Sequence, residues 1–198
     1  MATYAEALFL ERAYSRLEYA NKIERDVLYV ENTIPVYKKC DVLYNSWVND
    51  SDKDIYHKGA LMLHSLRMVV DNDSLFFKAI RTMSQEFSMQ HVSTDQAVAA
   101  FNKHLGADYS VLFDWYLKRV KPPVLDVYLD GTTHELHYQL QDAVPFSPTG
   151  ELLLFTSGEI GSIRPTTEYQ TVKLKESNLP QFMVSPSIYY IPETKKKI

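Results

Sequence analysis

Apolar residues recur at helical spacing as far as about residue 120 and then at strand spacing through the rest of the 198-residue chain. Intervals of three and four residues predict helices, whereas alternation of apolar and polar residues predicts half-buried strands. The change falls at Pro122 and Pro123, because proline cannot continue a helix. We therefore expect an α+β protein with two domains, a helical one over residues 1–121 and a small antiparallel β-sandwich over residues 122–198.

The helical part divides into several amphipathic segments. Residues 2–30 predict one or two helices, and the polar, proline-bearing stretch 31–54 indicates a loop. A further helix is expected over residues 55–70, with Asp52 or Asp54 available to cap it. The apolar positions expected to face the core in the first segment are Ala5, Leu8, Phe9, Leu17, Ala20, Ile23, Val27 and Leu28.

Capping residues mark the later helices. "DNDS" (residues 71–74) contains both a stop and a new N-cap. Ser93 or Thr94 is a cap for the next helix, with Gln96 in the capping-box place after Ser93 and Gly106 as the C-terminal stop. A short last helix is expected just before the two prolines.

The second part of the chain contains at least five strand candidates. "DGTT" (residues 130–133) joins the first two as a hairpin, and turns that contain proline or glycine separate the others. The candidates are "VLDVYLD", "HELHYQLQ", "ELLLFTSG", "YQTVKLKE" and "SIYYIPE".

Composition and charge narrow the classes of function. The net charge of -4 and the pI near 5.9 give no electrostatic basis for binding nucleic acid or an anionic membrane. We read the basic run Lys195–Lys197 as a solvated tail. No apolar stretch reaches the ~20 residues that span a bilayer. Cys40 is the single cysteine, which excludes a disulfide framework and a thiolate metal cluster but does not determine the compartment.

The residues alone do not predict a metal site or a catalytic nucleophile. "HELH" (residues 134–137) has its histidines three apart on a predicted strand, so they would point to opposite faces. His57 and His64 are two helical turns, or about 10 Å, apart, which is too far for one ion. There is no G-x-S-x-G, and Cys40 has no histidine near it in the sequence.

Tyr56 is the strongest candidate for chemistry, although in a chain with fourteen tyrosines a structural role is the default interpretation. A phenol of pKa ~10 stays protonated at neutral pH and can donate a hydrogen bond to an oxyanion. Gly59 lies three residues on, next to Tyr56 on the helix surface. Glycine costs ~1 kcal/mol in a helix interior, so close approach of a backbone or a substrate is one reason for its presence.

These residues resemble a known family. "IYHKGALMLHSLR" is similar to the Y-x-K-G-A-x-x-L-x-x-L-R stretch of zinc aminopeptidases of the aminopeptidase N and leukotriene hydrolase type, which are gluzincins. "ATYAEALFLE" resembles the segment directly after their E-G-F, and "RPTTEYQTVKL" resembles a segment of their β domain. The run from "HVSTDQ" to the double proline is similar to their threonine-capped helix and the helix after it. The resemblance extends over nearly the whole chain, in the same order.

The resemblance implies a mechanism and a fold. The helices would be the second half of a thermolysin-like catalytic domain, followed by the β-sandwich. In the family, two histidines and a glutamate hold a zinc ion that activates water to cleave peptides at a free N-terminus. The tyrosine of Y-x-K-G, here Tyr56, donates a hydrogen bond to the tetrahedral intermediate. The resemblance implies structural roles for Lys58 and Gly59, and an incidental or structural one for His57.

The sequence also departs from the family. It contains no H-E-x-x-H and no G-x-M-E-N, and the third-ligand glutamate would fall just before Ala2. We therefore expect a fragment that lacks the zinc-bearing N-terminal half, binds no catalytic zinc and is inactive alone. Helices 2–30 and 55–70 should then expose apolar surface and favour self-association. The alternative is a non-catalytic interaction module of helices and β-sandwich. Bacterial relatives are often periplasmic or secreted, but this chain carries no evidence of its compartment.

Overall fold

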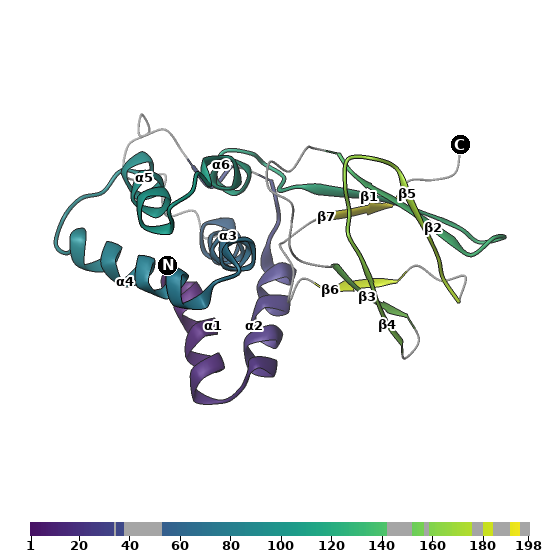
Figure 1. Cartoon of the computed structure of the whole chain (residues 1–198), viewed down its shortest axis with the longest axis horizontal. Coiled ribbons are helices and arrows are strands. Elements are labelled where there is room, and N and C mark those ends of the chain that lie inside the picture. Colours follow the sequence, from purple (N-terminus) through teal and green to yellow (C-terminus); the bar gives the residue numbers. More distant parts are fainter. Residues whose placement is uncertain are drawn as a thin grey trace.

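The structure is a computed structural model that describes residues 1–33, 35–37, 53–141, 152–156, 159–175, 180–183 and 191–194 (Figure 1). Within these ranges the helices precede the strands, as the periodicities predicted. Cys40, Asp52 and Lys195–Lys197 lie outside the described residues. The helices are α1 (Ala2–Ala13), α2 (Arg16–Tyr29), α3 (Asp54–Val70), α4 (Asp73–Glu86), α5 (Thr94–Leu105) and α6 (Ser110–Leu117).

Helices α1 and α2 form a pair that projects from the rest of the helical part (Figure 1). They are separate helices because Ser15 caps α2, its hydroxyl accepting the Glu18 N–H at 3.2 Å. Their buried faces carry tyrosines, Tyr4 and Tyr19, whose hydroxyl groups lie 3.2 Å apart. This pairing explains an error in the predicted apolar face. Four residues expected there are exposed: Ala5, Phe9, Leu17 and Leu28.

Helix α3 is the centre of the helical part and contacts α1, α2, α4 and α6. Nine of its residues are buried. The expectation that Asp54 caps α3 was wrong, because the N-cap is Lys53 and no side chain caps the helix. Asp54 instead accepts the backbone N–H groups of Glu31 at 2.7 Å and Asn32 at 2.9 Å. It therefore joins the start of α3 to the segment after α2.

The other predicted caps are confirmed. Asn72 caps α4 by accepting the Leu75 N–H at 3.0 Å. Ser93 and Gln96 form a capping box at α5, and Gly106 ends that helix in the left-handed conformation, with a φ of 75°. These caps are read easily from sequence because each involves residues at most a few positions apart.

The strands form two sheets, of order β5-β2-β1-β7 and β4-β3-β6. The predicted β1–β2 hairpin is confirmed, with Asp130 opposite Glu135. The expectation of a purely antiparallel arrangement was wrong, because β1 and β7 are parallel. The chain reaches β7 after a strand of the other sheet, so no hairpin forces the opposite direction. The strands are β1 (Val124–Asp130), β2 (Glu135–Leu140), β3 (Leu152–Thr156), β4 (Glu159–Ile163), β5 (Gln170–Lys173), β6 (Gln181–Met183) and β7 (Ile191–Thr194).

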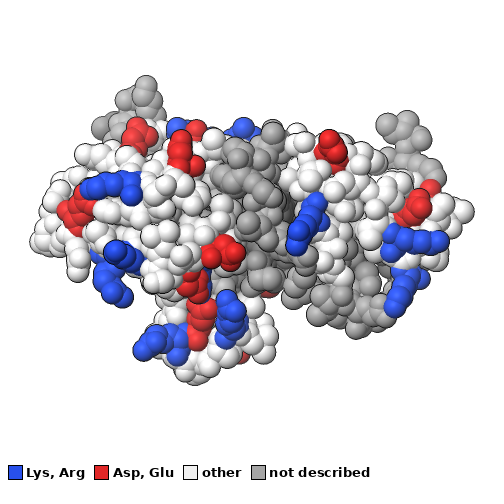
Figure 2. All heavy atoms as spheres, viewed as in Figure 1, with Lys and Arg blue, Asp and Glu red and all other residues white. Residues whose placement is uncertain are grey.

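The helices and the strands have separate hydrophobic cores that meet at α3. The strand core is built on Leu125, Leu136 and Leu140, and Met68 and Val69 of α3 pack against it. None of the described helices combines the length and hydropathy needed to span a membrane. On the face seen in Figure 2, acidic and basic side chains lie side by side over the α1–α2 projection.

Candidate functional site around Tyr56

Tyr56 lies in the first turn of α3 with 63% of its surface exposed. Its hydroxyl group makes no hydrogen bond with any residue that the structure describes. The phenol is thus available to donate to a bound molecule.

His57, the next residue, is held against α2. Its Nδ1 lies 2.7 Å from Oδ1 of Asp26, and its ring stacks on that of Tyr29, with centroids 4.9 Å apart and planes at 27°. Lys22 donates to the same Asp26 oxygen at 2.6 Å. These contacts give His57 a structural role in positioning the first turn of α3.

Lys58, in contrast to Tyr56, is completely buried. Its ammonium group donates to the backbone carbonyl oxygens of Arg119, at 3.0 Å, and Val120. Burial lowers the pKa of Lys58, and the nearby Asp54 carboxylate opposes that shift. Lys58 therefore joins α3 to the segment that follows α6, in agreement with a structural role.

The start of α3 is consequently fixed on three sides. Asp54 binds the segment after α2, His57 binds α2 itself, and Lys58 binds the segment after α6. Side chains locked in this way hold a functional group in one place better than a free loop does. Tyr56 is the exposed residue in the middle of this anchored turn.

A pocket of about 670 Å³ opens between α1 and α2, beside His57. Its wall is mostly apolar and includes Ala2, Ala5 and Phe9. Asp26 also lines it, and its Oδ2 is buried without a hydrogen-bond partner among the described residues. Oδ1 of Asp26 is used by Lys22 and His57, so this wall combines apolar surface with one partly satisfied carboxylate.

Gly59 is half-buried on α3. A Cβ placed on Gly59 would meet no heavy atom within 4 Å in the part of the chain that the structure describes. Close packing against another described element is therefore not the reason for a glycine here, contrary to one sequence-based expectation.

The remaining histidines do not gather into a metal site. His134 lies in the turn before β2 with a φ of 59°, so the prediction that it belongs to the strand was wrong. His137 lies on β2 and contacts Thr171, with 3.1 Å between Nδ1 and Oγ1. Among the described residues, no group of three or more His, Cys, Asp or Glu is placed to hold a metal ion.

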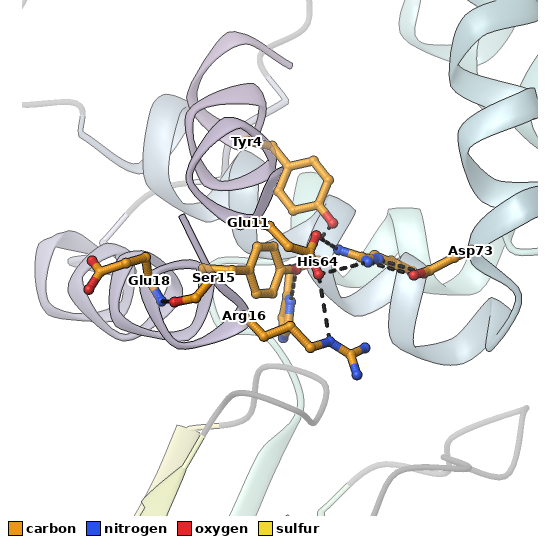
Figure 3. Close-up of polar contacts among 9 residues, drawn as sticks. Tyr4, Glu11, Ser15, Arg16, Glu18, His64 and Asp73 are labelled. Carbon is orange, nitrogen blue, oxygen red and sulfur yellow. Dashed lines mark hydrogen bonds and ion pairs between the residues drawn. The ribbon is translucent and has the colours of Figure 1, made fainter. Parts of the chain in front are cut away.

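Sequence reasoning missed a buried polar network that joins α1, α2, α3 and α4 (Figure 3). Arg67 donates to Glu11 at 2.7 Å and to Asp73 at 2.7 Å, and His64 contacts the Tyr19 hydroxyl at 2.7 Å. The hydrogen bond from Arg67 lowers the pKa of Asp73. The sequence did contain a sign of this network, because His64 and Arg67 lie three residues apart on an otherwise apolar stripe of α3.

Of the comparisons with known proteins, the one with solved structures indicates which fold this chain has. No protein-family model matches the chain, and no curated protein does. A solved structure, Legionella pneumophila aminopeptidase A in complex with aspartic acid, matches with a TM-score of 0.57 and 12% sequence identity. The chain has a distantly aminopeptidase-like fold. The match covers 98% of this chain and 23% of the Legionella chain, so this protein spans less than a quarter of that one.

Proposed function

We propose that this chain is part of a zinc-dependent aminopeptidase of the aminopeptidase N and leukotriene hydrolase type. In this proposal Tyr56 donates a hydrogen bond to the tetrahedral intermediate, and the chain forms one wall of a cleft that binds peptides. Residues 1–121 are the second half of a thermolysin-like catalytic domain, and residues 122–198 are the β-sandwich domain that follows it.

The position of Tyr56 is the observation that carries this proposal. Its phenol is exposed on a turn that Asp54, His57 and Lys58 anchor to other segments. A donor held in place before the reaction stabilises a developing oxyanion without reorganisation at the moment of reaction. Support also comes from the order of the resembling motifs along the chain and from the aminopeptidase-like fold.

The proposed zinc site needs residues from outside this chain. Zinc would supply an activated water, but the sequence has no H-E-x-x-H and the described residues form no metal-ligand group. We therefore propose that the chain alone binds no catalytic zinc and hydrolyses no peptide. Metal analysis of the purified chain tests this point, and one stoichiometric, tightly held zinc ion would contradict it.

The coding DNA upstream of Met1 gives a direct test. We expect an in-frame sequence that encodes H-E-x-x-H and, after it, a glutamate shortly before Met1. Expression of that segment joined to this chain should yield aminopeptidase activity. An upstream reading frame without H-E-x-x-H would overturn the peptidase proposal.

The joined protein then tests the role of Tyr56. Replacement of Tyr56 by Phe removes only the hydroxyl group, so kcat should fall by about 10²–10³ while KM changes little. Tyr169→Phe is the matched control, because Tyr169 is an exposed tyrosine next to β5 and should leave kcat unchanged. Equal kcat for wild type and Tyr56→Phe would overturn the assigned role.

A non-catalytic interaction module is the second candidate. It is favoured by the exposed apolar side chains of Phe9, Leu17 and Leu28 on the α1–α2 pair. The upstream DNA also separates the two candidates, since a module of this kind needs no zinc motif.

A further inference from the structure

The pocket between α1 and α2 contains a buried carboxylate that is only half used. The Asp26 side chain is 1% exposed. Its Oδ1 contacts two groups, the Lys22 ammonium at 2.6 Å and Nδ1 of His57 at 2.7 Å. Its Oδ2 is also buried and has no hydrogen-bond partner among the described residues. We call this pocket, of about 670 Å³, the α1–α2 pocket.

The orphaned oxygen of Asp26 calls for a physical reason. A buried polar atom without a partner has lost its hydrogen bonds to water and gained none, which is costly for a charged group. Nearly all buried polar atoms in proteins are therefore paired, with protein, with water or with a ligand. Oδ2 of Asp26 belongs to a residue that lines a pocket, so a donor that enters the pocket would satisfy it.

The charged groups of the wall select the kind of donor. The Lys22 ammonium is shared between Asp26 and the exposed Glu6 carboxylate, which lies 3.5 Å from it. The other basic residue of the wall, Arg25, is exposed, and its Nε donates to the backbone carbonyl of Asn21 at 3.3 Å. Both basic groups thus have partners, whereas one carboxylate oxygen has none. A cationic donor suits that oxygen best, because charge-assisted hydrogen bonds are the stronger ones.

The geometry favours an ammonium group over a guanidinium group. A guanidinium typically binds a carboxylate through two parallel hydrogen bonds. Because Oδ1 of Asp26 already has two partners, Oδ2 alone is left, and a compact ammonium needs only one acceptor. The apolar part of the wall can pack against a short carbon chain. It includes Ala2, Ala5, Phe9 and Leu10.

We propose that the α1–α2 pocket binds an alkylammonium group, a protonated primary amine on an apolar carbon chain, with the ammonium donating to Oδ2 of Asp26. A lysine side chain of a partner polypeptide and a free aliphatic amine both carry this group. Because Oδ2 is buried, binding includes a side-chain movement that admits the ammonium. Tyr56 does not line this pocket, and the proposal is independent of the zinc-peptidase assignment.

Alanine methyl NMR tests the proposal on the 198-residue chain. The probe is n-butylamine, which is protonated at pH 7 as a lysine side chain is, titrated into protein labelled at the alanine methyl groups. Ala2 and Ala5 line the pocket, whereas Ala13, at the end of the same helix, does not and is the internal control. We expect saturable shifts at Ala2 and Ala5 and none at Ala13. Equal shifts at all three, or no saturable shift at Ala2 and Ala5, would overturn the proposal.

Probes of the same length test the chemistry at equal ionic strength. 1-Butanol keeps the chain and a hydroxyl donor but lacks the charge, and butyrate reverses the charge. We expect 1-butanol to bind at least tenfold more weakly than n-butylamine, and butyrate not to bind. Equal affinity for the alcohol and the amine would contradict the proposal, since the pocket would then select only the chain.

N-acetyl-lysinamide distinguishes the two sources of the group. Tighter binding than that of n-butylamine indicates a lysine of a partner polypeptide, because the flanking amide groups then add contacts. Weaker binding indicates a free amine. Either result supports the alkylammonium site, provided that n-butylamine itself binds.

Asp26→Asn tests the acceptor, because it keeps the shape of the side chain and removes its charge. Binding of n-butylamine should weaken at least tenfold and approach that of 1-butanol. Asp95→Asn is the matched control, since Asp95 is exposed on α5 and does not line the pocket. It should bind like the wild type. Wild-type affinity in Asp26→Asn would show that Asp26 is not the acceptor and would sink the proposal.

Ala5→Leu keeps the proposal testable where Asp26→Asn fails to fold. Ala5 is exposed on α1 and lines the pocket, so a larger side chain there fills the space without entering the core. Binding of n-butylamine, followed at Ala2, should weaken at least tenfold. Ala13→Leu, a change of the same size at an exposed position outside the pocket, should bind like the wild type. Unchanged binding in Ala5→Leu, or an equal loss in both variants, would refute the assignment of the pocket.

Discussion

Three consecutive residues at the start of α3 have three different environments. Tyr56 is exposed, His57 binds Asp26 on α2, and Lys58 is buried against the carbonyl groups after α6. The sequence singled out Tyr56 through its motif, and the role of Tyr56 stays a prediction. It could not predict the partner of Lys58, because Arg119 lies 61 positions away and its carbonyl oxygen has no sequence signature.

Replacement of Lys58 by Met should destabilise the chain by about 1–3 kcal/mol, because two carbonyl groups lose their donor. Urea unfolding followed by circular dichroism measures this change. Lys78→Met, at an exposed α4 position, should stay within about 0.5 kcal/mol of the wild type. A Lys58→Met variant as stable as the control would show that these hydrogen bonds contribute nothing.

The lowered pKa of Lys58 also predicts a pH dependence. Between that lowered value and the ordinary 10.5, the unfolded chain binds more protons at this site than the folded chain. This site should therefore add stability as pH rises through that range. Unfolding free energies measured at several alkaline pH values should rise more for the wild type than for Lys58→Met. Parallel pH profiles would contradict the expected linkage.

The pair of Arg67 and Asp73 predicts a loss of stability in acid. The hydrogen bond from Arg67 holds the pKa of Asp73 below 3.8, so this contribution is complete above pH 3.8 and is lost as pH falls through the lowered value. Asp73→Asn should be less stable than the wild type at pH 6, by about 1 kcal/mol because Asp73 is half exposed. Acid titrations by circular dichroism should show the difference shrink as pH falls below 3.8 and through the lowered pKa of Asp73. A difference that is constant with pH would contradict the role given to this pair.

At the scale of elements, sequence predicted best where the deciding contacts are local. Ser93, Gln96 and Gly106 define α5 from within a few positions of its ends. Strands β4 and β6 were not predicted, because each forms by pairing with β3 rather than by a distinct local pattern. The exposed position of Phe9 was also missed, because the burial of Tyr4 depends on a hydroxyl partner on another helix.

The capping box of α5 gives a prediction at this scale. Ser93→Ala removes the acceptor for the Gln96 N–H and should destabilise the chain by about 1 kcal/mol. Ser93→Gly should cost only a few tenths of a kcal/mol, because glycine tolerates the N-cap conformation and leaves the N–H groups open to water. Thermal and urea unfolding of both variants would check the order, and a glycine variant less stable than the alanine variant would contradict it.

At the scale of the whole molecule, the α1–α2 pair exposes large apolar side chains. The expectation of exposed apolar surface agrees with Phe9, Leu17 and Leu28 on these helices, whereas α3 is mostly buried and exposes Tyr56. Such surface favours association, either with the N-terminal half that the proposed function requires or with a second copy. Sequence periodicity predicted where the helices are, but not which of their faces would lack a partner.

We expect the isolated chain to self-associate through this surface. Sedimentation velocity over a range of concentrations should show a dimer or larger form. The double variant Phe9→Ser and Leu28→Ser should shift the distribution toward monomer, whereas a control change at Met89, exposed elsewhere, should not. A wild-type chain that stays monomeric at every concentration would rule out self-association.

The parallel pairing of β1 with β7 has a consequence for how the chain folds. Val124 pairs with Ile191, so this edge of the sheet joins segments separated by most of the strand region. Closing so long a loop carries an entropic penalty before any pairing contact is gained, whereas the helix caps form within a few residues. During synthesis the helices can therefore form while β1 still lacks its neighbour. That strand edge stays open to mispairing until residues 191–194 have emerged, and the last of the described strands then completes the sheet.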